Sequence, residues 1–137
     1  MFKSCPCGHD MKLILRTVVH ARKASIVNVP VYSCEICSRN EVFPGVKEEL
    51  GRLVGRLGTR PQAQRIPFDE IHEWAAVLRE VAAADRPLQA ASVMRKAEER
   101  TNELLDLMLI ASSLGDEIWK KELKRRLSQL SAQYIPT

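Results

Sequence analysis

The chain has no hydrophobic run long enough to cross a membrane. No stretch approaches about eighteen consecutive apolar residues, and the richest run, residues 104–111, is interrupted by Asp106. The first ten residues are polar and lack the apolar run and small-residue cleavage site of a secretory signal. There is also no internal repeat and no low-complexity tract. We therefore expect a soluble, cytoplasmic protein, in a compartment where thiols stay reduced.

The sequence also lacks a recognisable catalytic arrangement. His20 and His72 have no neighbours that would pair them with a nucleophile, and the glycines do not form a phosphate-binding loop. We interpret His20 as a turn residue and His72 as a residue on a helix face. The expected protein is therefore not an enzyme.

What is present is an ordinary globular composition with a small positive excess. Hydrophobic residues make up 45% of the chain and charged residues 28%, which argues against disorder. The net charge is +4. There are ten Lys and Arg against five Asp and Glu through Arg60, and eleven against twelve after it. The excess therefore lies in the first half and is mild for a dedicated nucleic-acid-binding protein.

Cysteine occurs only four times, in two close pairs. Cys5 and Cys7 stand near the start, and Cys34 and Cys37 follow a strand-like stretch. This spacing indicates four thiolates around one closed structural Zn²⁺ site, with no open position for activating water. Two alternatives stay open. The thiols could be redox-active, although no βαβ pattern surrounds them, and His9 lies close enough to replace one ligand.

The residues between the two pairs alternate with period two and predict a β-hairpin. Its turn is expected at residues 21–24, where a three-residue loop would place Val19 opposite Val27 and Leu15 opposite Val31. Pro30 has no N–H to donate, so we expect it on an edge strand. A lone hairpin is marginal in water, and a metal joining its open ends would brace it.

After Pro44 the apolar period becomes helical. Residues 46–57 predict one helix, and residues 59–67, with two prolines and no periodicity, predict a linker. Asp69 is the expected N-cap of a second helix that ends near Asp85. A long helix should run from Leu88 to Gly115.

Asp116 is the expected cap of a last helix. These elements predict an α+β fold. A small zinc-ribbon β-hairpin domain, with one following helix, spans residues 1–58, and an α-helical domain spans residues 68–137.

Two surfaces could bind a partner. The long helix is apolar nearly all round from Leu104 to Ile110, which favours self-association or docking of a partner protein. The competing candidate is nucleic acid, contacted by basic residues of the hairpin and by the basic stretch 120–126 of the last helix. The basic residues concerned are Arg16, Arg22, Lys23, Lys120, Lys121, Lys124, Arg125 and Arg126.

The first third of the chain resembles a known domain. Cys-Pro-Cys-Gly at residues 5–8, the basic hairpin, Val-Pro-Val-Tyr-Ser-Cys-Glu-Ile-Cys at residues 29–37 and the helix after them are similar to the YgiT-type zinc-finger domain. That domain is the N-terminal part of MqsA-like antitoxins. The resemblance covers residues 4–57 and implies that Cys5, Cys7, Cys34 and Cys37 bind zinc and that the domain contacts a toxin partner. Ser38 stands where a glycine usually follows.

The same antitoxins continue into a helix-turn-helix that reads DNA, and no compact motif of this kind follows Gly58. We therefore expect a non-enzymatic, zinc-binding regulatory or adaptor protein that acts through protein–protein interaction. A DNA-binding transcriptional regulator of the antitoxin type is the alternative.

Overall fold

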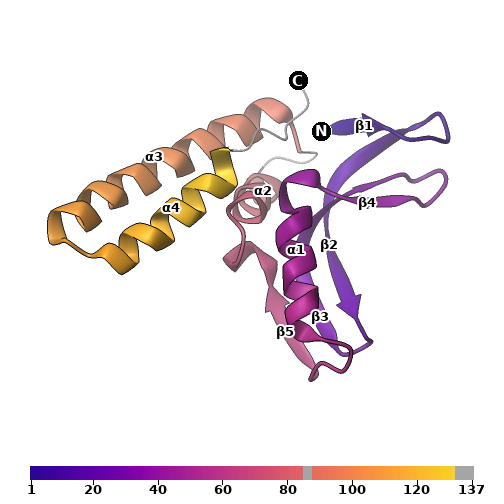
Figure 1. The fold of residues 1–137 in the computed structure, drawn as a ribbon. Helices are drawn as coiled ribbons and strands as arrows, with labels where there is room; N and C mark the ends of the chain where they lie inside the picture. The colour runs from indigo at the N-terminus through magenta and orange to yellow at the C-terminus, as the bar shows by residue number, and fades with distance from the viewer. Residues whose placement is uncertain (85–87, 132–137) are drawn as a thin grey trace.

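The structure is a computed structural model that describes residues 1–84 and 88–131. A curled sheet at the N-terminal end is followed by helices, so the predicted α+β class is confirmed (Figure 1). The strands are β1 (Phe2–Ser4), β2 (Asp10–His20), β3 (Ala24–Ser33), β4 (Asn40–Val42) and β5 (Gln64–Pro67). The helices are α1 (Pro44–Leu57), a 3₁₀ turn (Phe68–Glu70), α2 (Glu73–Ala84), α3 (Ala90–Leu114) and α4 (Glu117–Ser131).

The sheet is built around β3. The strand order is β1-β2-β3-β4, with antiparallel neighbours, and β5 pairs with β3 in parallel. Because β2 follows nearly the whole of β3 on one side, β4 and β5 share the other side, one near each end of β3. The expected linker is therefore wrong in its second half: residues 64–67 form a strand, because their backbone pairs with residues 24–27.

The hairpin forms as predicted, but its register differs. The turn is three residues long, and β3 resumes at Ala24, so Val19 lies opposite Ser25 rather than Val27. Further along, Leu15 lies opposite Pro30 rather than Val31. The register shifts between Arg16 and Val18, where β3 carries one extra residue. Next to the turn the register differs from the expected one by two residues, because His20 lies opposite Ala24, and the bulge reduces the difference to one residue at Leu15. A bulge of this kind cannot be read from a hydrophobic alternation alone.

Asn28 lies at this bulge, and its backbone is left-handed, with φ of 61°. Asparagine is one of the few residues that tolerates this conformation. Its side-chain amide donates to Asp69 Oδ1 at 2.9 Å, which ties the bulge to the 3₁₀ turn. Asp69, the predicted N-cap of the second helix, therefore accepts a hydrogen bond from the sheet instead. The helix itself, α2, begins four residues later, at Glu73.

Pro30 lies in the central strand, so the expected edge position is wrong. Its carbonyl accepts a hydrogen bond from the Phe43 amide at 2.9 Å, on the side of β3 that carries β4. In a strand the N–H and C=O of one residue point to the same side. The position at which Pro30 lacks an N–H therefore faces the chain just beyond Val42, the last paired residue of β4, so no strand hydrogen bond is lost there.

The buried residues form one cluster that extends from the sheet into the helices. Tyr32, Phe43 and Trp74 make a chain of rings across this junction, with centroids 6.1 Å apart at each step. Leu104 and Leu123 carry the cluster into the α3–α4 hairpin. The sheet and the helices are therefore packed on a shared core.

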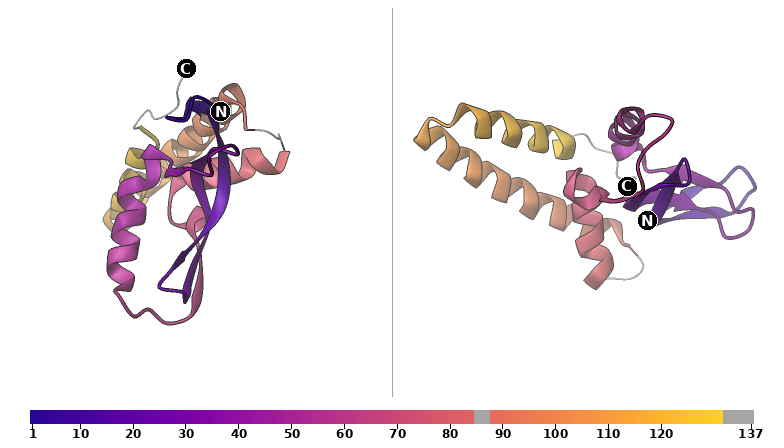
Figure 2. Two further views of the ribbon diagram at one scale, coloured as in Figure 1. Left: turned by 90° about the vertical axis from the view of Figure 1, so that its right-hand side faces the viewer. Right: turned by 90° about the horizontal axis from the view of Figure 1, so that it is seen from below.

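The α3–α4 hairpin projects away from the sheet as two long helices side by side (Figures 1 and 2). Gly115 ends α3 in the left-handed conformation, with φ of 67°, and Asp116 Oδ1 accepts from the Trp119 amide at 3.0 Å. The predicted cap of the last helix is therefore confirmed. The predicted helix end at Asp85 lies outside the described residues. Within residues 1–84 and 88–131, none of the helices combines the length and apolar character of a membrane span.

Candidate metal centre

The four cysteines lie together at one end of the β2–β3 hairpin. Cys5 and Cys7 belong to the loop between β1 and β2, and Cys34 and Cys37 belong to the loop between β3 and β4. Pairing of β2 with β3 brings the two loops side by side. The four Sγ atoms all lie within 4.8 Å of one another. The structure therefore assembles the cluster that the spacing indicated.

Backbone hydrogen bonds shape both loops. In the first, the Cys5 amide donates to His9 O at 2.7 Å and the Gly8 amide donates to Cys5 O at 3.0 Å. In the second, the Ser38 amide donates to Cys34 O at 3.0 Å. Gly8 and Ser38 both adopt positive φ, 95° and 62°. Ser38 thus occupies a left-handed conformation that favours glycine.

The sulfur atoms are close but not bonded. Cys5 Sγ lies 3.5 Å from Cys37 Sγ, and Cys7 Sγ lies 3.6 Å from Cys34 Sγ. A disulfide needs about 2.05 Å, so the four cysteines are free thiols. Cys5 and Cys34 are buried, whereas Cys7 and Cys37 are exposed. An ion could therefore enter from the side of the exposed pair.

The protein environment separates the acidities of the thiols. The amide of Cys37 lowers the pKa of Cys34, and with help from the Ile36 amide it outweighs burial and brings the value to about 7. The amide of Cys7 also lowers the pKa of Cys5, but burial and the neighbouring thiols outweigh it and raise the value to about 12. Amides aimed at sulfur stabilise thiolates, the form that binds metals.

His9 lies beside the cluster. Its Nδ1 is 3.6 Å from Cys7 Sγ, a hydrogen-bond distance for sulfur. Among the described residues, the set of possible ligands whose donor atoms are mutually close consists of the four cysteines and does not include His9. The donor set is thus four soft thiolates, which select Zn²⁺, Cu⁺ or iron–sulfur clusters.

The predicted apolar stretch of α3 is only half buried. Leu104 packs in the core and Met108 against it, whereas Leu105, Leu109 and Ile110 are exposed. One side of the stretch thus forms the hairpin with α4, and the remainder faces solvent.

The basic stretch of α4 is largely engaged in ion pairs. Lys120 pairs with Glu117 at 3.6 Å, Arg125 with Glu122 at 2.5 Å, and Arg126 with Glu73 at 2.5 Å. On the hairpin, Arg16 donates to Ser33 Oγ at 3.3 Å, and Arg22 and Lys23 are exposed at the turn. Carboxylates therefore compensate much of the positive charge of the α4 stretch, whereas the cations at the hairpin turn are exposed to solvent.

Sequence reasoning missed a buried ion-pair cluster at the start of α2. The Glu73 carboxylate accepts from Arg100 of α3 and from Arg126 of α4, each at 2.5 Å, and these hydrogen bonds outweigh burial and lower its pKa. Its amide donates to Gln129 Oε1 at 3.0 Å. These contacts fix the base of the α3–α4 hairpin. In the sequence, the only indication of this cluster was that an acidic residue, Glu73, stands next to the apolar stripe of the helix.

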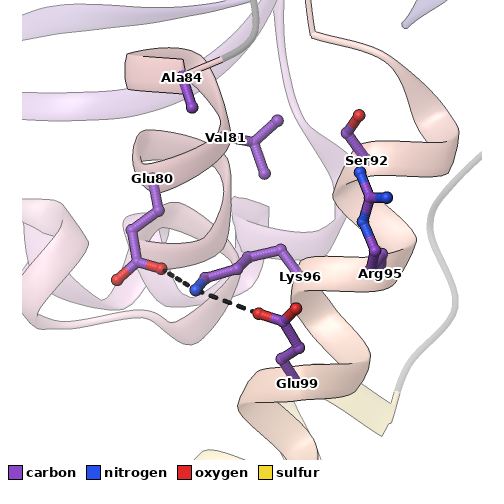
Figure 3. A pocket seen from close by; sticks show the side chains of 7 residues that line it. All are labelled: Glu80, Val81, Ala84, Ser92, Arg95, Lys96 and Glu99. Atoms are coloured by element: carbon purple, nitrogen blue, oxygen red, sulfur yellow. Dashed lines mark hydrogen bonds and ion pairs between the residues drawn. The ribbon is translucent and has the colours of Figure 1, made fainter.

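A groove of about 370 Å³ lies between α2 and α3. In Figure 3, Lys96 extends between the carboxylates of Glu80 and Glu99, at 3.0 and 3.4 Å. Because these charges compensate one another, we interpret the groove as part of the α2–α3 contact.

No family model matches the chain, and neither the curated proteins nor the solved structures contain a match.

Proposed function

We propose that this chain is a non-enzymatic, zinc-stabilised adaptor that acts by binding protein, in the first place a second copy of itself. Zinc holds the open ends of the sheet together, and the α3–α4 hairpin provides the contact surface. The observation that carries the first part is the convergence of four Sγ atoms within 4.8 Å.

The sulfur separations fit zinc. A tetrahedral ion with Zn–S bonds of about 2.3 Å has S–S edges of about 3.8 Å. Two of the six sulfur–sulfur separations, 3.5 and 3.6 Å, are close to this value, and all six are within 4.8 Å. Among the soft ions, Zn²⁺ has no redox chemistry and forms closed four-thiolate structural sites. Its role here is to stabilise the fold, because a small sheet with short edge strands gains folding energy from the bound ion.

The contact surface is the hairpin tip patch, defined as Leu105, Leu109, Ile110, Leu114 and Ile118. These five residues are between 47% and 86% exposed. Their exposed fractions add to slightly more than three whole residues, so a contact that covered all five completely would bury at most roughly 600 Å² per copy and roughly 1,200 Å² in total. That area is at the lower limit of specific, stable interfaces.

The charges around the patch favour a second copy as its occupant. Asp106, Asp116 and Glu117 are acidic, and Lys120 and Lys121 are basic, all within one end of the hairpin. A two-fold pairing can place the acidic part of one rim against the basic part of the other. With three acidic and two basic residues, this rim has a net charge of only −1, which offers little to a strongly acidic or basic partner.

Native mass spectrometry tests both parts together. We expect a dimer with one zinc ion in each chain, and elemental analysis should identify the metal. Changing Leu109 and Ile118 together to Gln should give a monomer that keeps its zinc, because both side chains are exposed. The control is Val19→Gln, which alters an exposed apolar residue of the sheet, 59% exposed against 71% for Leu109 and 86% for Ile118, and should leave the dimer intact.

A wild-type chain that is monomeric at micromolar concentration would refute the self-association, and a chain purified with iron or without metal would refute the zinc assignment. The resemblance of residues 4–57 to the YgiT-type zinc-finger domain, and the toxin contact that it implies, stay predictions. So does the cytoplasmic location.

A further inference from the structure

A cluster of cations lies at the end of the sheet opposite the cysteines. We call it the basic pole and define it as Arg22, Lys23, Arg56, Arg60 and Arg65. All five residues are exposed. The ten residues of β3 separate the pole from the cysteine loops by about 33 Å. It lies at the lower end of β2, β3 and α1 in Figure 1.

Tertiary contacts bring these residues together from separate segments. The Gln64 amide donates to Lys23 O at 3.1 Å, and His20 Nε2 lies 2.7 Å from Gly58 O. Arg65 lies opposite Ser25 in the parallel β3–β5 pairing. The hairpin turn, the end of α1 and the start of β5 are thus held as one surface.

The pole has no acidic counterpart. The sequence contains no Asp or Glu between Met11 and Cys34, and none between Leu50 and Phe68. Within the described part of the chain, none of the five cations forms an ion pair. Elsewhere many cations have a carboxylate partner, as Arg52, Arg100 and Arg126 do.

We propose that the basic pole binds the phosphodiester backbone of double-stranded nucleic acid. Clustered like charges destabilise the folded protein by mutual repulsion, and a row of phosphates would relieve that repulsion. Four of the five cations are arginines, whose planar guanidinium group donates to phosphate in a bidentate manner. This activity goes beyond the protein–protein role proposed above and uses the opposite end of the sheet from the metal.

The composition of the pole argues for a duplex backbone over other anionic partners. Val19 is the only large exposed apolar residue near the turn in the described part of the chain, so the apolar centre typical of a protein interface is missing. The pole contains no aromatic residue, whereas binding of single strands relies on stacking of bases on aromatic rings. Phosphate contacts alone predict binding without sequence preference.

Fluorescence anisotropy with labelled 20-base-pair duplexes tests the proposal, one of DNA and one of RNA with the same sequence. Five phosphate contacts predict a slope of log K against log salt of about −4.5 on DNA. We expect micromolar binding at low salt that is lost as the salt concentration rises. The two duplexes show whether the A or the B form is preferred, and binding to either supports the proposal.

Removal of three cations locates the contact. In the triple variant Arg22→Ala, Arg60→Ala, Arg65→Ala, the slope of log K against log salt should become shallower, about −2. The affinity at low salt should decrease at least about a hundredfold. The matched control carries the same change of charge elsewhere: Lys47→Ala, Arg95→Ala, Lys124→Ala. All three control residues are exposed and lie outside the hairpin tip patch and its rim, and the control should lose less than about threefold. Unchanged zinc content and thermal unfolding would show that both variants fold.

Four results would overturn the proposal: no binding to either duplex at low salt, an equal loss in the control, tighter binding to a single strand than to the duplex, or binding to vesicles of anionic lipid without binding to a duplex. Because the dimer and the metal are measured separately, these outcomes are independent of the adaptor function.

Discussion

Lowering the pH from 8 to 5 should destabilise the protein through His72. This residue is only 3% exposed, and its ring stacks on Phe68 with centroids 6.0 Å apart. Its Nδ1 accepts a hydrogen bond from the Trp74 amide at 3.0 Å, so the ring is neutral, with its proton on Nε2. Burial lowers the pKa of His72 to about 4, Glu73 opposes this shift and Arg125 adds to it.

The direction of this change in stability with pH follows from proton binding. The pKa of His72 is lower in the folded protein, about 4, than the ordinary value of 6.5 in the unfolded chain. Between these values the unfolded chain binds the proton and the folded protein does not. The stabilisation is therefore complete above pH 6.5 and is lost as the pH falls toward 4. At pH 5 the free energy of unfolding should be lower by about 2 kcal/mol than at pH 8.

Urea unfolding at several pH values measures this loss, with His72→Asn as the comparison. Asn places an oxygen where Nδ1 accepts from the Trp74 amide, and it does not titrate. The variant should be less stable at pH 8 because it fills less volume, but the difference from wild type should shrink by about 2 kcal/mol at pH 5. Proton effects at the cysteines are common to both proteins and cancel. Parallel stability curves, or an NMR titration that gives His72 a pKa near 6.5, would refute the reasoning.

Three further substitutions test other parts of the structure. Cys34→Ser should remove most of the bound zinc and lower the thermal unfolding temperature, as measured by elemental analysis and calorimetry, and a variant that keeps one zinc per chain would contradict the ligand assignment. Glu73→Gln should cost about 2 to 3 kcal/mol in urea unfolding because it leaves two partly buried arginines without a carboxylate, whereas the exposed control Glu70→Gln should cost less than about 0.5 kcal/mol. Ser38→Gly should raise the stability by about 0.5 to 1 kcal/mol in the same assay because it relieves a left-handed serine, and a loss of stability would show that the serine hydroxyl has a role.

Several elements could be predicted because their signals are local. The alternation before and after residues 21–23 predicted the hairpin, the apolar stripe after Pro44 predicted α1, and Asp116 predicted the start of α4. Such signals depend on residues within a turn or two of one another. The two cysteine pairs were equally informative, because a hairpin between them forces the loops together.

Other features depended on partners that are distant in the chain. Residues 64–67 look like a linker until β3 offers them a pairing edge about forty residues earlier. The bulge at Asn28 shifted the register, and it is anchored by Asp69, 41 positions away. Glu73 meets Arg126 across 53 positions. None of these contacts leaves a periodic trace in the sequence.

From the sequence alone one could derive the main hairpin, the helices, the grouping of the four cysteines and the absence of acidic residues from two segments. Contacts between distant residues in the fold bring those two segments together at one pole, join three helices at Glu73 and leave one side of α3 exposed. The physical reason is that periodicity and spacing report local geometry, whereas charge compensation and burial depend on which distant residues the fold places side by side.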